Sequence, residues 1–240
     1  MSESNEQSVN EILHKCGVKV RLGKGLGSTE MMASATQTYE GCNETGSVGI
    51  PLVWINCKIT EPGTTKELSY NCEGEICFSG PTLMLGYYNR EDATNDIVKI
   101  HSDGERWIHT GDVGYISGSG FIYVTGRVKR IAMTRDKFGQ VTKLFPDRIE
   151  KVIYTHKSVE ACCVIGVPDE TRINYPKAFI VMSDKENEEE KRSEILNICR
   201  KGLPEYMVPE EIEFVNDLPR TPRGKIDYKK LERQCLIKTE

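Results

Sequence analysis

Apolar residues recur along the chain with two periods, and each period predicts a different kind of element. Near the start they keep the three-to-four-residue spacing of one helix face, which predicts an amphipathic helix over residues 6–16 that Gly17 would end. Farther along, apolar runs bounded by turn residues predict short strands. These runs cover residues 18–22, 53–60 and 75–79. Asn89 is a candidate cap for a helix over residues 90–99.

The clearest pattern of alternation lies in the middle of the chain. Residues 112–117 and 120–126 alternate between apolar and polar positions, and the SGSG segment between them supplies a turn. This pattern predicts a β-hairpin. Pro146 follows after a polar stretch and suits the first position of a helix.

The last third of the chain mixes strands and helices. Residues 159–167 and 177–182 are apolar, β-branched runs that predict strands, and residues 211–215 predict a third strand. The charged run at 184–194 is either a solvated linker or the start of a helix that continues to Leu203. A last helix is expected over 227–235. We therefore expect an α+β protein.

Composition and charge narrow the class of protein. The chain has 240 residues, 38% hydrophobic and 28% charged, with a net charge of −4, which does not favour a nucleic-acid partner. It holds no run of about 20 apolar residues for a membrane span, and its polar N-terminus does not resemble a signal peptide. Nine cysteines without CxxC spacing predict buried free thiols in a reducing cytosol. We expect a cytoplasmic protein without a zinc site.

Five segments, in one order, resemble the signature segments of the adenylate-forming superfamily, which includes acyl-CoA synthetases, peptide-synthetase adenylation domains and luciferases. The segments are GLGSTE (25–30), EGEICFSGPTLMLGYY (73–88), WIHTGDVGYISGSGFIYVTGRVKR (107–130), LPEYMVP (203–209) and PRTPRGKIDYKKL (219–231). The resemblance covers most of the chain from about residue 18 to 235. The chain resembles the C-terminal half of such an enzyme.

The resemblance implies a fold and a reaction. It implies that residues 1–127 are the C-terminal portion of a large AMP-binding domain, ending in a small β-rich distorted barrel, and that residues 128–240 are a mobile lid domain with a small mixed sheet and helices. Members of the family form an acyl-adenylate from ATP and a carboxylic acid, and then pass the acyl group to a nucleophile such as the thiol of coenzyme A. ATP or AMP, Mg²⁺ and coenzyme A are the cofactors implied.

The hairpin carries two residues that the resemblance assigns to the nucleotide. Asp112, in HTGDVG, would accept hydrogen bonds from both ribose hydroxyls, since a carboxylate has two oxygens that suit a vicinal diol. The alternative is a turn residue beside Gly111. Arg127, in TGRVKR, would bind near the same ribose and the phosphate; the alternative is a surface arginine after a strand.

The GLGSTE segment resembles the adenine loop of the family. Gly27 would permit a tight turn near the nucleotide, with Ser28 beside it, Thr29 on the α-phosphate and Glu30 on Mg²⁺. The alternative is a helix N-terminus that Ser28 caps. The segment departs from the family where many members place an aromatic residue on adenine, because the chain offers Leu26 there.

Three residues beyond the hairpin complete the implied site. Lys225, in TPRGKID, would bridge the substrate carboxylate and the α-phosphate; the alternative is a solvated lysine. Lys129 occupies the hinge position, where a backbone rotation would turn the lid. Gly139, in a stretch slightly longer than in the family, would let the pantetheine arm of coenzyme A pass close to the backbone, or else it marks a plain hairpin turn.

The Gly/Ser/Thr-rich loop that cradles the β- and γ-phosphates in this family does not occur in the sequence. We therefore expect a truncated chain that needs a missing N-terminal half, that does not adenylate an acid alone, and that self-associates through exposed apolar edges. The expected reaction is thioester formation between a fatty or aromatic acid and coenzyme A. Two alternatives are an adenylation domain that loads a carrier protein and a non-catalytic nucleotide-binding module.

Overall fold

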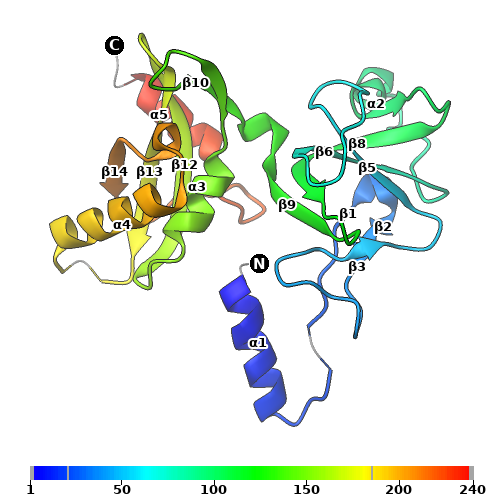
Figure 1. Ribbon diagram of the computed structural model, residues 1–240, viewed down its shortest axis with the longest axis horizontal. Helices are drawn as coiled ribbons and strands as arrows, with labels where there is room; N and C mark the ends of the chain where they lie inside the picture. Colours follow the sequence, from blue (N-terminus) through cyan, green and yellow to red (C-terminus); the bar gives the residue numbers. More distant parts are fainter. Residues whose placement is uncertain (1–2, 21, 185, 238–240) are drawn as a thin grey trace. The chain divides into compact units, whose positions relative to one another are not determined.

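A computed structural model describes residues 3–20, 22–184 and 186–237. The chain divides into two compact units, of which the first ends at Val128 and the second begins at Lys129. Figure 1 shows that both units combine strands with helices, and the described residues contain five α-helices and several small sheets. The fold is therefore a mixed α/β one, in agreement with the sequence prediction. Among these residues, no helix combines the length and apolar content that crossing a membrane requires.

The first unit is organised around a five-stranded antiparallel sheet. Its strands are β5 (Asn56–Thr60), β6 (Gly74–Ser79), β7 (Val98–Ile100), β8 (Arg106–Ile116) and β9 (Ile122–Arg127). The order is β5-β6-β8-β7, and β9 also pairs with β8. The 11 residues of β8 are long enough to pair with β7 near one end and with β9 near the other. Buried side chains of this sheet, among them Ile59, Ile76, Phe78 and Ile108, form the core of the unit.

Short elements precede this sheet or lie between its strands. They are α1 (Glu3–Lys15), β1 (Gly27–Ser28), the 3₁₀ helix η1 (Thr29–Met31), β2 (Ala33–Ser34), β3 (Thr36–Gln37), β4 (Ile50–Pro51) and α2 (Glu91–Ile97). β1 pairs with β2 and β3 pairs with β4, so each pair is an antiparallel ribbon of minimal length. The distorted barrel expected for this part of the chain stays a prediction.

Two sequence predictions in the first unit need correction. Residues 18–20 and 22 form no strand; Arg21 lies outside the described residues. The predicted first helix is confirmed as α1, although Ile12 on its apolar face is 59% exposed. Asn89 does not cap α2, because Arg90 occupies the N-cap position and Asn89 adopts a left-handed φ of 51°.

The second unit is a three-layer sandwich. Its sheet joins β12 (Val159–Asp169) and β13 (Ile173–Met182) as an antiparallel pair, and β14 (Glu211–Phe214) runs parallel to β13. The remaining elements are η2 (Val128–Arg130), β10 (Ala132–Arg135), β11 (Val141–Leu144), α3 (Pro146–Ile153), α4 (Glu188–Gly202), η3 (Glu205–Met207) and α5 (Tyr228–Ile237).

Alternation along β12 separates the two faces of this sheet. Cys162 and Val164 point into a core shared with α3 and α4, while Cys163 and Ile165 point into a second core shared with Leu231 of α5. The predicted helix at Pro146 and the three predicted strands are confirmed. The charged run is a helix start, since α4 begins at Glu188; Lys185 within the run lies outside the described residues.

None of the nine cysteines forms a disulfide bond. Four of them are buried. Burial raises the pKa of Cys77 to about 12 and that of Cys199 to about 11. The prediction of buried thiols is wrong for Cys16 and Cys72, which are exposed. Both lie just beyond regular elements, where an apolar sequence position has no sheet or helix to pack against.

Candidate functional site

The β8–β9 hairpin places Asp112 directly opposite Arg127. Arg127 Nε lies 2.7 Å from Asp112 Oδ1, so the two side chains form an ion pair within the first unit. The Asp112 side chain is 11% exposed and that of Arg127 is 54% exposed. A partly buried carboxylate thus stands beside a cation that reaches into solvent. The prediction of a nucleotide role for these residues stays a prediction, but the structure brings them together.

The TGD segment that carries Asp112 is a bulge in β8. Between the pairs Glu75↔Val113 and Cys77↔His109, the strand β8 has three residues where β6 has one. Gly111 adopts a φ of 71°, a left-handed conformation that favours glycine. Asp112 therefore belongs to a strand irregularity rather than to a loop turn, and bulges of this kind redirect side chains.

The Thr110 hydroxyl and the Glu75 carboxylate restrain the backbone of the bulge through hydrogen bonds. The Thr110 hydroxyl donates to the Ile76 carbonyl at 2.7 Å and accepts the Asp112 N–H at 3.0 Å. Glu75 Oε1 accepts the Gly111 N–H at 3.0 Å. The two amides that precede the Asp112 Cα are therefore held by side chains of its own sheet.

Glu75 belongs to a buried polar chain that sequence reasoning missed. Its Oε2 lies 2.9 Å from His109 Nδ1, and His109 Nε2 lies 3.0 Å from His101 Nε2. Burial raises the pKa of the Glu75 carboxyl, but hydrogen bonds from His109 and from the Gly111 amide outweigh it and leave that pKa below its ordinary value. Glu75 and His109 lie inside the EGEICFSG and WIHTGD segments, so the residues were visible, but their contact depends on strand register.

The GLGSTE segment forms a ribbon and one turn of 3₁₀ helix. A side chain at Gly27 would place its Cβ 2.0 Å from the Ala33 carbonyl oxygen, so the β1–β2 ribbon requires glycine there. Ser28 occupies the N-cap position of η1 but makes no capping hydrogen bond with its side chain. The helix interpretation of this segment is thus correct only for three residues, beginning at Thr29. The side chain of Leu26 packs against the core of the unit.

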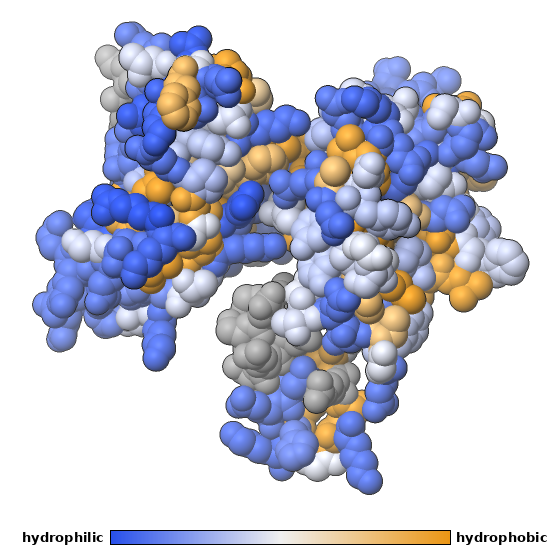
Figure 2. All heavy atoms as spheres, in the orientation of Figure 1, coloured by the Kyte–Doolittle hydropathy of each residue, from blue (hydrophilic) through white to orange (hydrophobic). Residues whose placement is uncertain are grey.

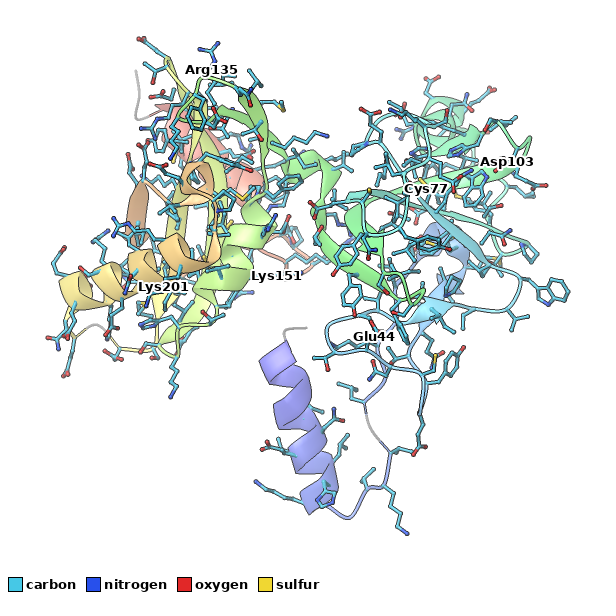
Figure 3. All side chains as sticks on the ribbon, viewed as in Figure 1. Glu44, Cys77, Asp103, Arg135, Lys151 and Lys201 are labelled. Atoms are coloured by element: carbon cyan, nitrogen blue, oxygen red, sulfur yellow. The ribbon has the colours of Figure 1, made fainter. Side chains whose placement is uncertain are left out.

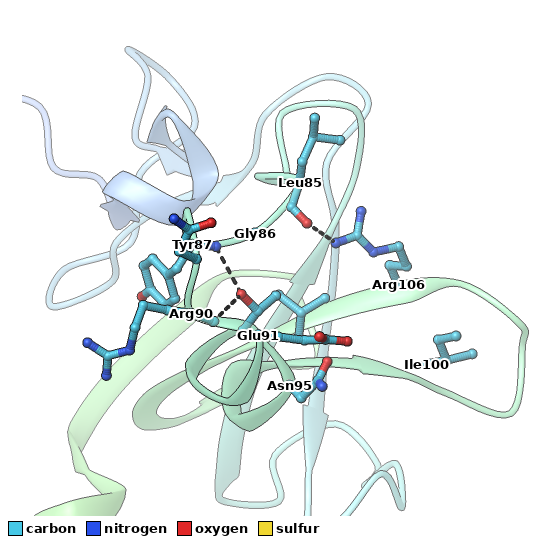
Figure 4. A pocket seen from close by; sticks show the side chains of 11 residues that line it. Leu85, Gly86, Tyr87, Arg90, Glu91, Asn95, Ile100 and Arg106 are labelled. Carbon is cyan, nitrogen blue, oxygen red and sulfur yellow. Dashed lines mark hydrogen bonds between the residues drawn. The ribbon is translucent and has the colours of Figure 1, made fainter.

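Glu30 is held by a residue that sequence reasoning also missed. The Tyr87 hydroxyl donates to Glu30 Oε1 at 2.6 Å, and the Met84 N–H donates to the Glu30 carbonyl at 2.9 Å. The hydrogen bond from Tyr87 lowers the pKa of Glu30, and the same bond raises the pKa of Tyr87 to about 12. Tyr87 also borders an open hollow over α2, where its N–H donates to Thr94 Oγ1 at 2.9 Å (Figure 4).

Glu30 is the one acidic residue that the sequence analysis assigned to a metal. Within the described ranges, no group of three or more His, Cys, Asp or Glu side chains is arranged to hold a metal ion. An ionised carboxylate without further protein ligands suits Mg²⁺, which usually keeps several waters and binds through one or two carboxylates and the phosphates of a substrate.

In the second unit, Lys225 lies on a pinned turn between β14 and α5. The Thr221 N–H donates to the Lys225 carbonyl at 2.7 Å, and the Lys225 N–H donates to Thr221 Oγ1 at 3.2 Å. Gly224 has a φ of 77°, and its carbonyl accepts Arg220 Nη1 at 3.1 Å. The Lys225 side chain is exposed. The turn fixes the backbone while the long side chain extends into solvent.

The segment around Lys129 is anchored at both ends. Arg127 pairs with Asp112 in the first unit, and Arg130 pairs with Glu150 and Asp147 in the second, with Arg130 Nη2 2.6 Å from Glu150 Oε1. Arg130 Nη2 also donates to the Val164 carbonyl at 2.9 Å. Val128 and Lys129 thus lie between the two ion-paired arginines. A backbone rotation at these two residues would leave both sets of ion pairs intact.

Gly139 occupies the turn between β10 and β11. Its φ is 79°, and a Cβ added there would meet no atom within 4 Å. Asp136 Oδ1 accepts the N–H groups of Phe138 and Gln140, each at 2.9 Å. The hairpin interpretation of Gly139 is confirmed, and a contact with coenzyme A stays a prediction.

Comparison with known proteins independently supports the resemblance of this sequence to AMP-binding enzymes. A family profile described as "AMP-binding enzyme" matches residues 2–88, and one described as "AMP-binding enzyme C-terminal domain" matches residues 148–225. The putative acyl–CoA ligase YdaB of Bacillus subtilis (strain 168) is 33% identical over 220 residues, which are 91% of this chain and 41% of that protein. The 2-succinylbenzoate–CoA ligase of Bacillus cytotoxicus is 33% identical over 220 residues, 92% of this chain and 42% of that protein.

A solved structure agrees with these sequence matches. The anthranilate CoA ligase AuaEII in complex with anthranoyl-AMP has a TM-score of 0.82 and 25% sequence identity, and the match covers 100% of this chain and 44% of that one. The chain thus spans less than half the length of the relatives it matches.

Proposed function

Because the chain belongs to the adenylate-forming superfamily of AMP-binding enzymes, we propose that it supplies the ribose-binding sheet and the lysine-bearing domain of an AMP-forming carboxylate–CoA ligase. The observation that carries the proposal is the Asp112–Arg127 ion pair on the TGD bulge. That pair offers a carboxylate and a cation side by side, which a ribose 5′-phosphate requires.

The proposed reaction has two steps. In the first, a carboxylate oxygen of the acid attacks the α-phosphorus of ATP, the new P–O bond forms, and the bond to pyrophosphate breaks. In the second, the sulfur of coenzyme A attacks the acyl carbon, its proton is released, and AMP leaves with the electron pair of the C–O bond. The first step brings negative groups together, so fixed donors and positive charge must lie where charge develops.

Asp112 and Arg127 would hold the nucleoside end. Asp112 would accept hydrogen bonds from the 2′- and 3′-hydroxyls, and its bond to Arg127 Nε orients it for this task. The remaining guanidinium N–H groups of Arg127, which is 54% exposed, would donate to the hydroxyls or the α-phosphate. Gly27, Ser28 and Thr29 would border the nucleotide, with the Thr29 hydroxyl donating to an α-phosphate oxygen.

Glu30 would hold Mg²⁺ together with the phosphates of ATP. When bound, the ion supplies positive charge that offsets the charge on the phosphates. The hydrogen bond from Tyr87 orients one oxygen of Glu30 and lowers the pKa of its carboxyl group, which favours the ionised form that binds a cation.

Lys225 would bring a mobile cation to the acid and the α-phosphate. A lysine ammonium on a four-carbon stem can reach two oxygens of different groups, and the pinned turn presents it without a fixed partner in the described structure. Lys129 would be the pivot between the units, because Arg127 before it and Arg130 after it are each ion-paired within their own unit. Gly139 would lie where the pantetheine arm of coenzyme A passes.

The names of the relatives favour coenzyme A as the acyl acceptor. One relative is named for 2-succinylbenzoate and one solved structure for anthranilate, and both are aromatic acids. We propose a fatty or aromatic acid as the substrate. We also propose that the chain acts with an N-terminal half that supplies the triphosphate cradle and the acyl pocket.

Two measurements test this function. In an ATP–pyrophosphate exchange assay the chain alone is expected to show no turnover above background, and turnover would contradict the need for a second half. In calorimetry, Asp112→Ala is expected to weaken AMP binding at least about tenfold, because hydrogen bonds to a charged group contribute roughly 1.5–3 kcal/mol. Glu61→Gln, which alters the exposed ion pair with Lys66 in the same unit, is the control. Equal affinity in all three proteins would overturn the ribose role.

A further inference from the structure

We propose that Glu75 is a positioning residue for ribose recognition: its buried carboxylate holds the Gly111 amide and so fixes the direction of the Asp112 side chain. The inference rests on the proposed ribose role of Asp112. Glu75 touches no substrate in this account. It acts through the backbone of the bulge.

The geometry of the bulge makes this carboxylate necessary. A regular antiparallel strand would pair the Gly111 N–H with a carbonyl of β6, but three residues of β8 face one residue of β6 here, so one amide is left without a ladder partner. Glu75 Oε1 accepts that N–H at 3.0 Å. Gly111 immediately precedes Asp112 and has a left-handed φ of 71°, and because glycine adopts many backbone conformations readily, a hydrogen bond to its amide favours this one.

Glu75 is itself held by two buried histidines. Its side chain is 7% exposed and that of His109 is 4% exposed, so both are shielded from water. His109 Nδ1 donates to Glu75 Oε2 at 2.9 Å. We assign the donor of the next contact to His101, so that its Nε2–H points to His109 Nε2 at 3.0 Å and its buried Nδ1 is an acceptor without a partner.

This order of donors is the one the surroundings favour. Burial, followed by the charge of Lys58, lowers the pKa of His101, so His101 is neutral and keeps a single N–H. If that proton sat on Nδ1 instead, a buried donor would lack a partner, which is rarer and costlier than an unpaired acceptor. The order of donors therefore runs from His101 through His109 to Glu75, and Glu75 serves as acceptor for both of its neighbours.

The isosteric change Glu75→Gln removes one of these two acceptors. One end of the new amide is a donor, and it must face either the Gly111 N–H or the His109 Nδ1–H. If the donor end faced His109, the His109 proton would have to move from Nδ1 to Nε2. The His101 proton would then lie on Nδ1, where no group accepts it. The variant thus keeps the volume of the side chain and removes the restraint on Gly111.

The decisive experiment compares AMP with 2′,3′-dideoxy-AMP, which lacks the two hydroxyls that Asp112 would bind. The natural chain is expected to bind AMP at least about tenfold more tightly than the dideoxy analogue, by the strength of charged hydrogen bonds. Glu75→Gln is expected to lose most of that ratio, as Asp112→Ala does, while its affinity for the dideoxy analogue stays unchanged. A merely structural role would weaken both ligands equally.

Glu44 provides a matched control. Its carboxylate also accepts two hydrogen bonds in the same unit, from Ser119 Oγ at 2.6 Å and from the Tyr123 hydroxyl at 2.7 Å, and so joins the β8–β9 hairpin away from the bulge (Figure 3). Glu44→Gln is expected to retain the full ratio. A full ratio in Glu75→Gln, or an equal loss in both variants, overturns the proposal.

A second pair of variants leaves Glu75 in place. The side-chain amide of His109→Asn can still donate to Glu75 and is expected to keep the ratio, whereas His109→Leu is expected to lose it. Equal ratios in these two variants contradict the proposal even if Glu75→Gln does not fold.

A ligand-free readout separates this inference from the proposed function. Hydrogen exchange of the Gly111 amide is expected to accelerate in Glu75→Gln and not in Glu44→Gln. If the natural chain does not discriminate between the two nucleotides, the ribose role of Asp112 fails, and the exchange of Gly111 still decides whether Glu75 holds the bulge. Unchanged exchange in Glu75→Gln overturns the proposal.

Discussion

Single residues of the first unit owe their charge state to near neighbours rather than to burial alone. Lys58 Nζ lies 2.8 Å from Asp103 Oδ2 and 3.8 Å from the centroid of the Trp107 ring. Trp107 Nε1 donates to the same carboxylate, with 3.0 Å to Oδ2. This cluster flanks His101, whose ring stacks on Trp107, so the charges around the buried histidine chain are fixed in place.

Acid titration tests this cluster. The hydrogen bond from Lys58 lowers the pKa of Asp103 from 3.8 to about 2. Because the folded value is depressed, the carboxylate stabilises the folded chain above pH 3.8, and that contribution is lost as the pH falls toward 2. In Lys58→Met the pKa of Asp103, followed by carbon NMR of its carboxyl group, is expected to rise toward 3.8. An unchanged pKa would show that Lys58 is not the cause.

At the scale of elements, the sequence predicted strands and helices best where they contribute to a core. The hairpin of β8 and β9, the α3 helix and the strands of the second unit follow alternating or helical patterns, and their apolar residues are buried. Residues 18–22 have the same composition, but Val20 is 68% exposed and the described residues near it form no strand. Composition alone does not make a strand without a partner.

Contacts between strands could not be predicted from the sequence. The TGD segment, Lys225 and the GSTE segment were recognised from local motifs, whereas the bond between Glu75 and Gly111 joins residues 36 positions apart. A bulge shifts the register by two residues at this point, and no local pattern specifies where a bulge falls. The same reason explains why Tyr87 was not connected with Glu30, from which it is separated by 57 positions.

The ion pairs of Arg130, which anchor the segment after Lys129 to the second unit, can be tested by mutation. Arg130 has a side chain only 12% exposed, and it neutralises Glu150, whose side chain is 14% exposed. Arg130→Met would leave that acid buried without a cation, with only the Val164 N–H as a donor, so we expect a loss of about 3–5 kcal/mol in the stability of the second unit. Hydrogen exchange of the β12 and β13 amides measures this loss.

Arg172 is the matched control for that change. It pairs with Glu210, but its side chain is 52% exposed. Exposed ion pairs contribute about 0–1 kcal/mol, so Arg172→Met should leave the exchange nearly unchanged. Similar acceleration in both variants would argue against Arg130 as an anchor, and with it against a pivot at Lys129.

On the scale of the whole molecule, the two units differ in how well they cover their apolar residues. The second unit buries two clusters on opposite faces of its sheet. The first unit leaves large apolar side chains in solvent, among them Leu85 at 92%, Val53 at 80% and Trp54 at 79% exposed. Apolar side chains stand among polar ones on the face of this unit that Figure 2 shows. Exposed apolar surface of this kind favours association.

Light scattering coupled to size exclusion tests this difference. We expect the full chain to self-associate in a concentration-dependent way and residues 130–240 alone to run as a folded monomer, because that part has its own core. Trp54→Lys should reduce the association of the full chain by charging its exposed apolar surface. A monomeric full chain at high concentration would contradict the expectation.

The central claim is that Asp112 and Lys225 act on one adenylate, and a chemical footprint tests it most directly. Acetylation of exposed lysines is followed by mass spectrometry with and without an acyl-sulfamoyl adenosine, a stable mimic of an acyl-adenylate. The account predicts that the mimic protects Lys225 but not exposed Lys201 or Lys229, and that Asp112→Ala abolishes this protection. Modification of Lys225 at the same rate with saturating mimic would contradict the account.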